Sequence, residues 1–164
     1  MLGILVLNIS VFSSEFAGKT FKAADDIGEW PPYVFNVRKN GEKTKEISGY
    51  SFDLVKKIAE KENFEVEVDL LPWKRAMKNV EIGRYQILMD STITSERKKK
   101  YYYSLPIYTI NNYYFYDINN FPQGLEIKSK KDLKKYKMGG LFGYSYEAYG
   151  VKSNEIDQGT KGAA

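Results

Sequence analysis

The polar segment DSTITSER, residues 90–97, carries the side chains best suited to hold a small solute. It follows a short apolar run with one carboxylate, Asp90, and several hydroxyls, and it ends on Arg97. An arginine binds a carboxylate through two parallel hydrogen bonds, and the hydroxyl of Thr92 can complete the oxygen contacts. The segment therefore predicts an anion-binding turn. The alternative is an ordinary helix cap followed by a surface arginine.

Both tryptophans of the chain stand beside charged residues, one within a loop and one at the start of an expected helix. Asp25 and Trp30 are candidate ligand contacts in the loop DDIGEWPPY. Its prolines hold the loop in one shape, so that Trp30 can stack on a ligand or cover a cation. Trp73 and Arg75 begin an expected helix, where free N–H groups and a guanidinium attract an anion. The alternatives are a tryptophan at the edge of the core and a surface arginine above a packed tryptophan.

A third candidate is the turn GYSY at residues 143–146. Its glycine permits a tight strand-to-helix turn, and Tyr144 and Ser145 would then lie beside the free N–H groups of a helix. The serine is not set in a G-x-S-x-G elbow, and the sequence has no histidine to activate it. The turn therefore indicates binding rather than nucleophilic catalysis.

The composition excludes several kinds of chemistry. The absence of cysteine and histidine removes disulfides, thiol nucleophiles, Cys/His zinc sites and Ser-His triads. We expect neither a metal nor another cofactor. The net charge of +4 is mild, and the lysine runs at 98–100 and 128–137 are typical of solvated faces. Because no nucleic-acid motif accompanies them, we do not expect nucleic acid as a partner.

Hydrophobic periodicity predicts alternating strands and helices in the first part of the chain. Strands are expected at 20–24, 64–71 and 85–89, and helices at 51–62 and 72–80. Ser51 is expected to cap the first of these helices, with Asp53 in its first turn, and Gly83 to end the second. This alternation predicts an α/β fold with a mostly parallel sheet, whose carboxyl edge gathers the ligand-binding loops.

Further elements are expected in the second part. A short helix is expected from Thr94, strands at 101–104, 112–116 and 137–142, and helices at 129–136 and after Ser145. Ser129 and Asp132 have the spacing of a capping box, with aspartate in place of the usual glutamate.

The N-terminus predicts export. The apolar run at 2–12, followed by two serines, is typical of a signal peptide over residues 1–17 and is too short to span a membrane. No basic residue precedes it, so either the true start lies upstream or Met1 is not the natural start; a buried first strand or helix is the alternative. We expect one lobe over 18–110, and a crossing strand with the start of a second lobe over 111–164. Because one helix and one strand cannot cover a sheet, we expect this second lobe to be incomplete.

The series of motifs resembles family 3 of the bacterial extracellular solute-binding proteins, the polar amino-acid type that serves ABC transporters. The matching segments cover most of residues 20–150: WPPY at 30–33, GYSFDLVKKIAEK at 49–61, LPWKRAMKNVEIG at 71–83, TITSERKKKYYYSLPIY at 92–108 and KSKKDLKKYKMGGLFGYSY at 128–146. The PWKRA variant is similar to a subgroup whose ligands are often not polar amino acids of known identity. The resemblance implies a type II periplasmic-binding-protein fold, in which two α/β lobes hold a ligand between them.

The resemblance also implies roles for individual residues. By the family pattern, ligand contacts fall on Trp30, Trp73, Asp90, Thr92, Arg97, Tyr144 and Ser145. Arg97 would bind the ligand carboxylate, with Thr92 beside it. Two departures stand out: Gln86 replaces a usual aspartate, and Asp90 stands where the family often has a serine. An inward-pointing Asp90 would neutralise Arg97 and weaken carboxylate binding, or would favour a cationic or amine-bearing ligand.

We therefore expect a periplasmic or otherwise extracytoplasmic monomer that captures an amino acid, or a related amine or carboxylate. Hinge closure would deliver the ligand to a membrane ABC permease. We expect no enzyme activity, and weak or absent affinity for the incomplete chain. Two alternatives stay open. One is the sensory input domain of a receptor. The other is a dehydratase-like enzyme, for which Glu29, Asp90 and Glu147 are the candidate acids or bases.

Overall fold

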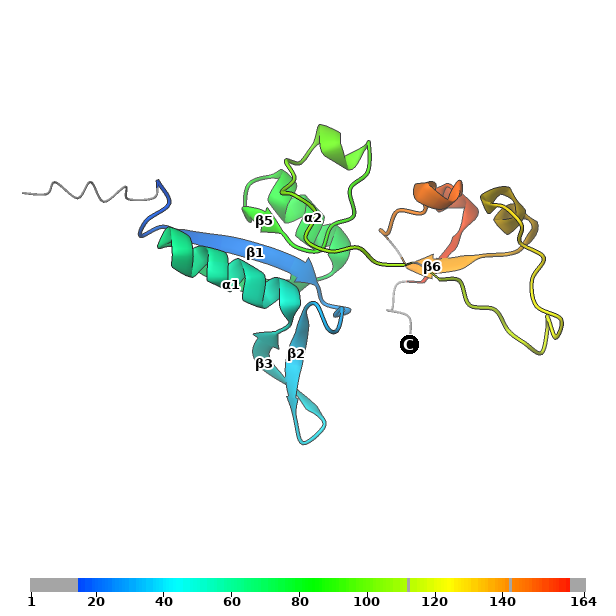
Figure 1. Cartoon of the computed structure of the whole chain (residues 1–164), viewed down its shortest axis with the longest axis horizontal. Helices are drawn as coiled ribbons and strands as arrows, with labels where there is room; N and C mark the ends of the chain where they lie inside the picture. The colour runs from blue at the N-terminus through cyan, green and yellow to red at the C-terminus, as the bar shows by residue number, and fades with distance from the viewer. Residues whose placement is uncertain (1–14, 112, 142, 160–164) are drawn as a thin grey trace, which may run out of the picture. The chain divides into compact units, whose positions relative to one another are not determined.

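The computed structural model describes residues 15–111, 113–141 and 143–159 (Figure 1). Most of the predicted signal peptide, residues 1–14, lies outside the described residues. The chain forms two compact units, one up to Thr92 and one from Ile93 onward, and each is described by itself. The lobe boundary expected at residue 110 stays a prediction.

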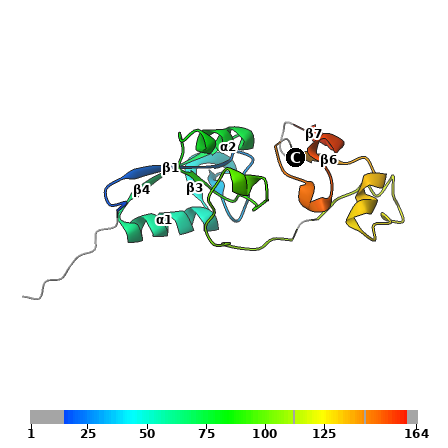
Figure 2. The ribbon, with the colours of Figure 1, turned by 90° about the horizontal axis from the view of Figure 1, so that it is seen from above.

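The first unit is built on a parallel sheet of three strands in the order β4-β1-β5. The strands are β1 (Thr20–Asp26), β4 (Glu65–Leu71) and the short β5 (Ile87–Leu88). The chain passes from β1 to β4 on one side and then returns across β1 to β5. Right-handed crossovers therefore place α1 (Tyr50–Glu62) and α2 (Trp73–Glu81) on opposite faces, as Figure 2 shows. The predicted parallel α/β sheet is confirmed.

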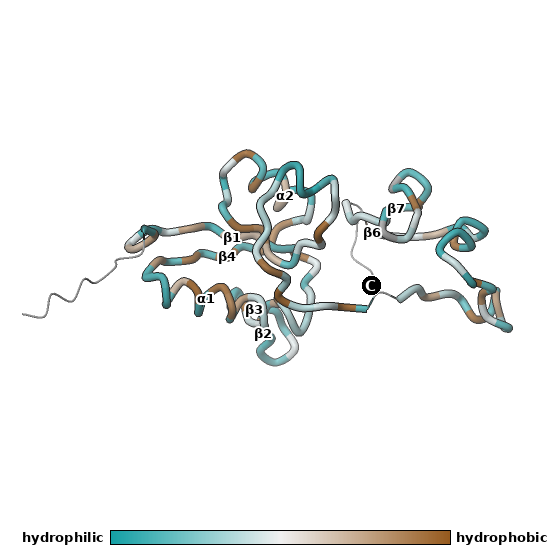
Figure 3. Tube along the Cα trace, turned by 45° about the horizontal axis from the view of Figure 1, so that its top comes forward, coloured by the Kyte–Doolittle hydropathy of each residue, from teal (hydrophilic) through white to brown (hydrophobic). Residues whose placement is uncertain are grey.

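The core of the first unit lies between this sheet and its helices. Ala23 and Ala24 are fully buried in succession because β1 is covered on both faces. Apolar and polar residues alternate along α1, whose apolar side packs toward the sheet (Figure 3). The core cluster consists of Ala23, Val34, Ala59, Val66 and Met89, with Ile47, Phe52, Val55, Phe64, Val68, Leu70 and Ile87 packed against it.

The start of α1 corrects one prediction. Ser51 was expected as the N-cap, but the N-cap is Gly49, and Ser51 lies inside the helix. The first helical N–H groups, of Tyr50 and Ser51, donate to the carbonyl oxygens of Pro32 and Tyr33 at 3.0 and 2.9 Å. Loop carbonyls thus replace a side-chain cap, which leaves the Ser51 hydroxyl available for another partner.

An antiparallel hairpin of β2 (Phe35–Lys39) and β3 (Glu42–Ser48) joins the Trp30 loop to α1. It was not predicted. The signal was present in Asn40-Gly41, a pair typical of two-residue hairpin turns, and both residues have positive φ, 54° and 84°.

The second unit contains less regular structure than expected. Strands predicted at 101–104 and 112–116 are wrong in the described residues, where no partner strand pairs with them (residue 112 lies outside). The helices expected from Thr94, at 129–136 and after Ser145 are 3₁₀ turns over Arg97–Lys99, Lys130–Lys135 and Glu147–Tyr149. A further 3₁₀ turn, Ser153–Glu155, precedes β7 (Asp157–Gly159), which pairs in parallel with β6 (Gly139–Leu141).

The predicted capping box at Ser129 and Asp132 is confirmed. The Ser129 N–H and hydroxyl both donate to Asp132 Oδ2, at 2.8 and 3.0 Å. Lys135 pairs with the other oxygen at 2.6 Å. Together these contacts lower the pKa of Asp132 to about 2, and the hydrogen bond from Lys135 contributes most.

Candidate functional site

The candidate site of the first unit lies at the carboxyl edge of its sheet. Asp25 is near the end of β1, Asp90 follows β5, and Trp73 follows β4. The connection from β1 runs to β4 on one side, and the next connection runs from β4 back across β1 to β5, so the direction of the connections reverses between β1 and β5. Open parallel sheets bind ligands at such a reversal, outside the carboxyl ends of the strands. The sequence-predicted residues Asp25 and Asp90 stand at this point.

The buried Asp25 and Ser51 form one polar cluster with the half-buried Asp90. The Asp25 side chain is 2% exposed, and its Oδ1 accepts the N–H of Asp26 at 2.6 Å. The Ser51 hydroxyl, also buried, donates to Asp90 Oδ1 at 2.5 Å. The remaining oxygen of each carboxyl group, Oδ2, is buried and meets no hydrogen-bond donor among the described residues.

Burial and the neighbouring carboxylate raise the pKa of Asp25 to about 8 from its ordinary value of 3.8. Burial contributes most, and the charge of Asp90 adds to it. The Asp26 N–H opposes the shift, while a hydrogen bond with Asp90 and the charge of Asp26 reinforce it. At neutral pH Asp25 therefore keeps its proton, and the pair carries one negative charge rather than two.

Asp90 also has an unusual backbone, with φ of 48° in the left-handed region. Aspartate tolerates this conformation better than most residues, and it turns the chain sharply after β5. Ser91 and the exposed Thr92 follow directly, so the position of Asp90 determines where these hydroxyls lie.

The two tryptophans differ in exposure. Trp30 is 43% exposed on the loop after β1, and its backbone N–H donates to the Val34 carbonyl at 2.7 Å. Trp73 is only 8% exposed at the start of α2, whereas Arg75 in the same turn is exposed. Trp30 is thus partly open to solvent, while Trp73 belongs mainly to the core. Ligand contacts by Trp30, Trp73 and Arg75 stay predictions.

Glu29 anchors the Trp30 loop to the β2–β3 hairpin. Its side chain is 5% exposed and pairs with Arg38 at 2.7 Å and Lys43 at 3.3 Å, and it accepts the Asn36 N–H at 3.1 Å. Burial alone would raise the pKa of Glu29, but the bonds from Arg38, the Asn36 N–H and Lys43 outweigh it and lower the pKa. Glu29, a candidate acid or base for an enzyme, is therefore held in a structural ion-pair cluster. Sequence analysis missed this role.

The other predicted ligand residues belong to the second unit. Arg97 is half-buried and begins a 3₁₀ turn, where its N–H donates to the Thr94 hydroxyl at 3.1 Å, as expected for a capping threonine. Tyr144 and Ser145 are half-buried in the turn after β6, which Gly143 enters with φ of 90°. Their participation in one site with the residues of the first unit stays a prediction.

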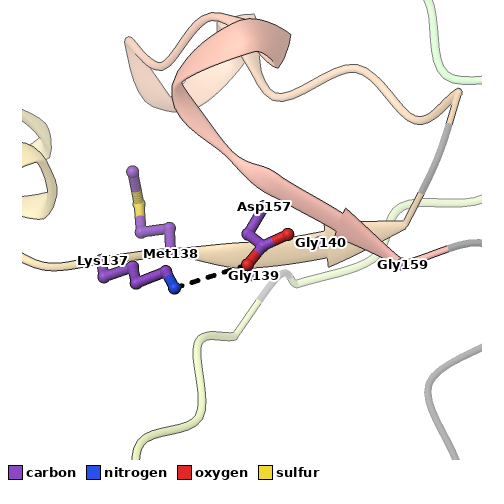
Figure 4. Close-up of a pocket in the computed structure, with 6 residues that line it drawn as sticks. All are labelled: Lys137, Met138, Gly139, Gly140, Asp157 and Gly159. Atoms are coloured by element: carbon purple, nitrogen blue, oxygen red, sulfur yellow. Dashed lines mark ion pairs between the residues drawn. The ribbon is translucent and has the colours of Figure 1, made fainter.

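A hollow of about 420 Å³ lies in the second unit, on β6 and β7 (Figure 4). Half of its lining residues are glycines, and an exposed ion pair joins Lys137 and Asp157 at 3.5 Å. It is lined by Lys137, Met138, Gly139, Gly140, Asp157 and Gly159, none of which is a predicted ligand residue. Within the described ranges, no group of three acidic side chains could hold a metal ion.

Comparison with known proteins agrees with this geometry. Residues 27–137 match the bacterial extracellular solute-binding proteins, family 3. The L-cystine-binding protein TcyJ of Escherichia coli (strain K12) is 28% identical over 123 residues, which cover 74% of this chain and 43% of that protein. The chain thus spans less than half the length of this curated relative.

A solved structure shows the same fold. An ancestral arginine-binding protein bound to glutamine aligns with a TM-score of 0.56 at 26% identity, over 79% of this chain and 54% of that one. An ancestral cationic amino acid solute-binding protein aligns over the same shares at 27% identity, with a TM-score of 0.48. The predicted type II periplasmic-binding-protein fold is confirmed. Because the family match covers more than half of its residues, the chain belongs to family 3 of the bacterial extracellular solute-binding proteins.

Proposed function

We propose that this chain is the ligand-capturing part of an extracytoplasmic binding protein for a small amino-acid-like solute. The observation that carries the proposal is the strand reversal between β1 and β5, where Asp25 and Asp90 meet. This is the point at which an open parallel sheet binds ligands, and the chain belongs to a family of solute-binding proteins.

The chemistry of this edge suits a zwitterion. The acidic pair keeps one negative charge at neutral pH, which attracts an ammonium group. The exposed indole of Trp30 can cover the ligand or its cationic part. On the family pattern, Arg97 binds the carboxylate beside Thr92, and Tyr144 and Ser145 supply further contacts. Arg75, exposed at the start of α2, offers another cation. An amino acid, or an amine that also carries a carboxylate, is the substrate class that these groups favour.

We further propose that the protein works outside the cytoplasmic membrane as a monomer, closes over its ligand and delivers it to an ABC permease. The family is extracellular, and the cystine-binding relative is a binding protein by name. Among the residues that the structure describes, no helix has the length and apolar character to cross a membrane.

Calorimetric titration tests the binding function. The native gene product that contains this chain is titrated with L-cystine, L-arginine and L-glutamine, the ligands named for its relatives. We expect saturable binding of at least one. Arg97→Ala should weaken it about tenfold or more, because a hydrogen-bonded charge pair contributes about 1.5–3 kcal/mol.

Lys98→Ala is the matched control, because Lys98 is an exposed cation in the same turn. It should leave the affinity within about twofold. Binding of none of the three amino acids by a folded protein would contradict the proposal. An equal loss of affinity in both variants would show that Arg97 does not bind the ligand.

A further inference from the structure

Three elements of the first unit meet at one buried polar cluster. Asp25 comes from β1, Ser51 from the first turn of α1, and Asp90 from the turn after β5. Asp25 and Ser51 are 2% and 1% exposed, so neither presents its side chain to solvent. Both interact with Asp90, which is half-buried and directly precedes Ser91 and Thr92.

The hydrogen bonds of the cluster leave a place for one proton. Asp25 Oδ1 accepts the Asp26 N–H, and Asp90 Oδ1 accepts the Ser51 hydroxyl. Asp25 Oδ2 and Asp90 Oδ2 are both buried, and no donor among the described residues reaches either. A single proton held between the two carboxyl groups would give both atoms a partner. Two ionised carboxylates side by side would repel each other in a place that water does not reach.

We propose that Asp25 and Ser51 are positioning residues, which hold Asp90 through a carboxyl–carboxylate hydrogen bond and a hydroxyl hydrogen bond and so place the turn that carries Ser91 and Thr92. Asp90 has φ of 48°, a region that still costs an aspartate free energy, and these two contacts help to hold it there. The cluster thereby couples the proton on Asp25 to the position of the Thr92 hydroxyl. Only the role of Thr92 as a ligand contact rests on the proposed function.

The charges around Asp25 are few. The carboxylates of Asp90 and Asp26 act on it directly. From α1, Ser51 supplies an uncharged hydroxyl, and the acid of β4 nearest the edge, Asp69, is exposed and accepts the Tyr85 hydroxyl at 2.8 Å.

The remaining neighbour, α2, buries only Trp73 and Ala76. Its charged residues that are exposed are Lys74, Arg75, Lys78 and Glu81. No cation therefore neutralises the pair from these elements. Loss of the shared proton leaves two adjacent anions, which should drive the Asp90 turn outward.

The test is a pH titration of the whole 164-residue chain by NMR, which follows aspartate carboxyl carbons together with the Ser91 and Thr92 amides. We expect the Asp25 carboxyl to titrate near pH 8 and both amides to shift with the same midpoint. In Asp25→Asn the amides should stay in their low-pH positions throughout, because an amide N–H takes the place of the shared proton. Asp53→Asn, which changes an exposed acid of α1, should leave the shift of both amides near pH 8 unchanged.

The wild-type titration alone decides the proposal if a variant does not fold. An Asp25 midpoint near 4, or amides of Ser91 and Thr92 that do not follow it, would overturn the coupling. Ser51→Ala should broaden the NMR signals of both amides at every pH, and Ser51→Thr should restore them. Unchanged amide signals in Ser51→Ala would show that Ser51 does not hold Asp90 in place. No measurement here uses a ligand. A failure to bind amino acids would therefore defeat the proposed function and leave this result standing.

Discussion

Asp25 makes the stability of the first unit depend on pH in a direction opposite to that of most carboxylates. Its pKa is about 8 in the folded chain and 3.8 for an ordinary aspartate. The unfolded chain releases this proton near pH 4, whereas the folded chain keeps it to about pH 8. The folded state therefore binds more protons between these values. Its contribution to stability is complete below pH 4 and is lost as the pH rises toward 8.

Replacement of Asp25 by asparagine should remove this dependence. The difference in unfolding free energy between Asp25→Asn and wild type should move in favour of the variant from pH 4 to pH 8, by at most about 6 kcal/mol. Urea unfolding of both chains at several pH values measures it. Asp53→Asn is the control and should give a difference that changes little with pH. A constant difference for Asp25→Asn would contradict the raised pKa.

At the scale of elements, the junction between the Trp30 loop and α1 depends on one glycine. Gly49 has φ of 124° and ψ of 167°, a region that essentially only glycine adopts. A Cβ atom there would overlap the carbonyl groups of Tyr33 and Pro32, which accept the first N–H groups of α1. The same close approach that caps the helix thus excludes every side chain at this position.

Gly49→Ala should destabilise the first unit by about 3 kcal/mol or more, because strain and steric overlap add. Gly41→Ala is its matched control. Gly41 also has positive φ, 84°, but a Cβ atom there meets nothing within 4 Å, so its cost should be about 1 kcal/mol. Denaturant unfolding of the two variants compares them. Equal costs would show that the carbonyl contacts at Gly49 do not matter.

At the scale of the whole molecule, the two units differ in how much apolar surface they bury. The first contains the core cluster around Ala23 and Val66. In the second, Val151 is the one apolar side chain that the described residues show as fully buried. Large side chains stay exposed there, among them Tyr102, Leu105, Tyr113, Phe115 and Ile118. Local stability follows buried apolar area, so the units should open with different free energies.

Hydrogen exchange on the full chain should show this difference. Amides of β1 and β4 should exchange at least about a hundredfold more slowly than those of residues 101–111 and 113–118, because the strand amides are paired and their side chains partly buried. Mass spectrometry of peptides from the exchanged chain measures both. Similar protection in the two units would mean that they unfold as one cooperative body.

Local patterns predicted local structure, and tertiary contacts account for the rest. The helix expected at 51–62 and the strand at 64–71 agree with α1 and β4 to within about a residue, because their periodicity reflects which face is buried. The aromatic run at 113–116 has strand propensity, but a strand also requires a partner. The contact between Ser51 and Asp90 joins residues 39 positions apart, and no local sequence pattern predicts such a pairing.

Because Trp30 and Trp73 differ in solvent exposure, intrinsic tryptophan fluorescence can report on the first unit. These are the two tryptophans of the sequence, and both lie in the first unit. Indole emission therefore follows that unit alone, whatever happens to the tyrosine-rich remainder. Trp73, shielded from water, should emit at shorter wavelength than Trp30, and a soluble quencher such as iodide should reach Trp30 first. A solute that settles on the exposed indole would protect it from iodide, so occupancy of the sheet edge can be followed by fluorescence without any added label.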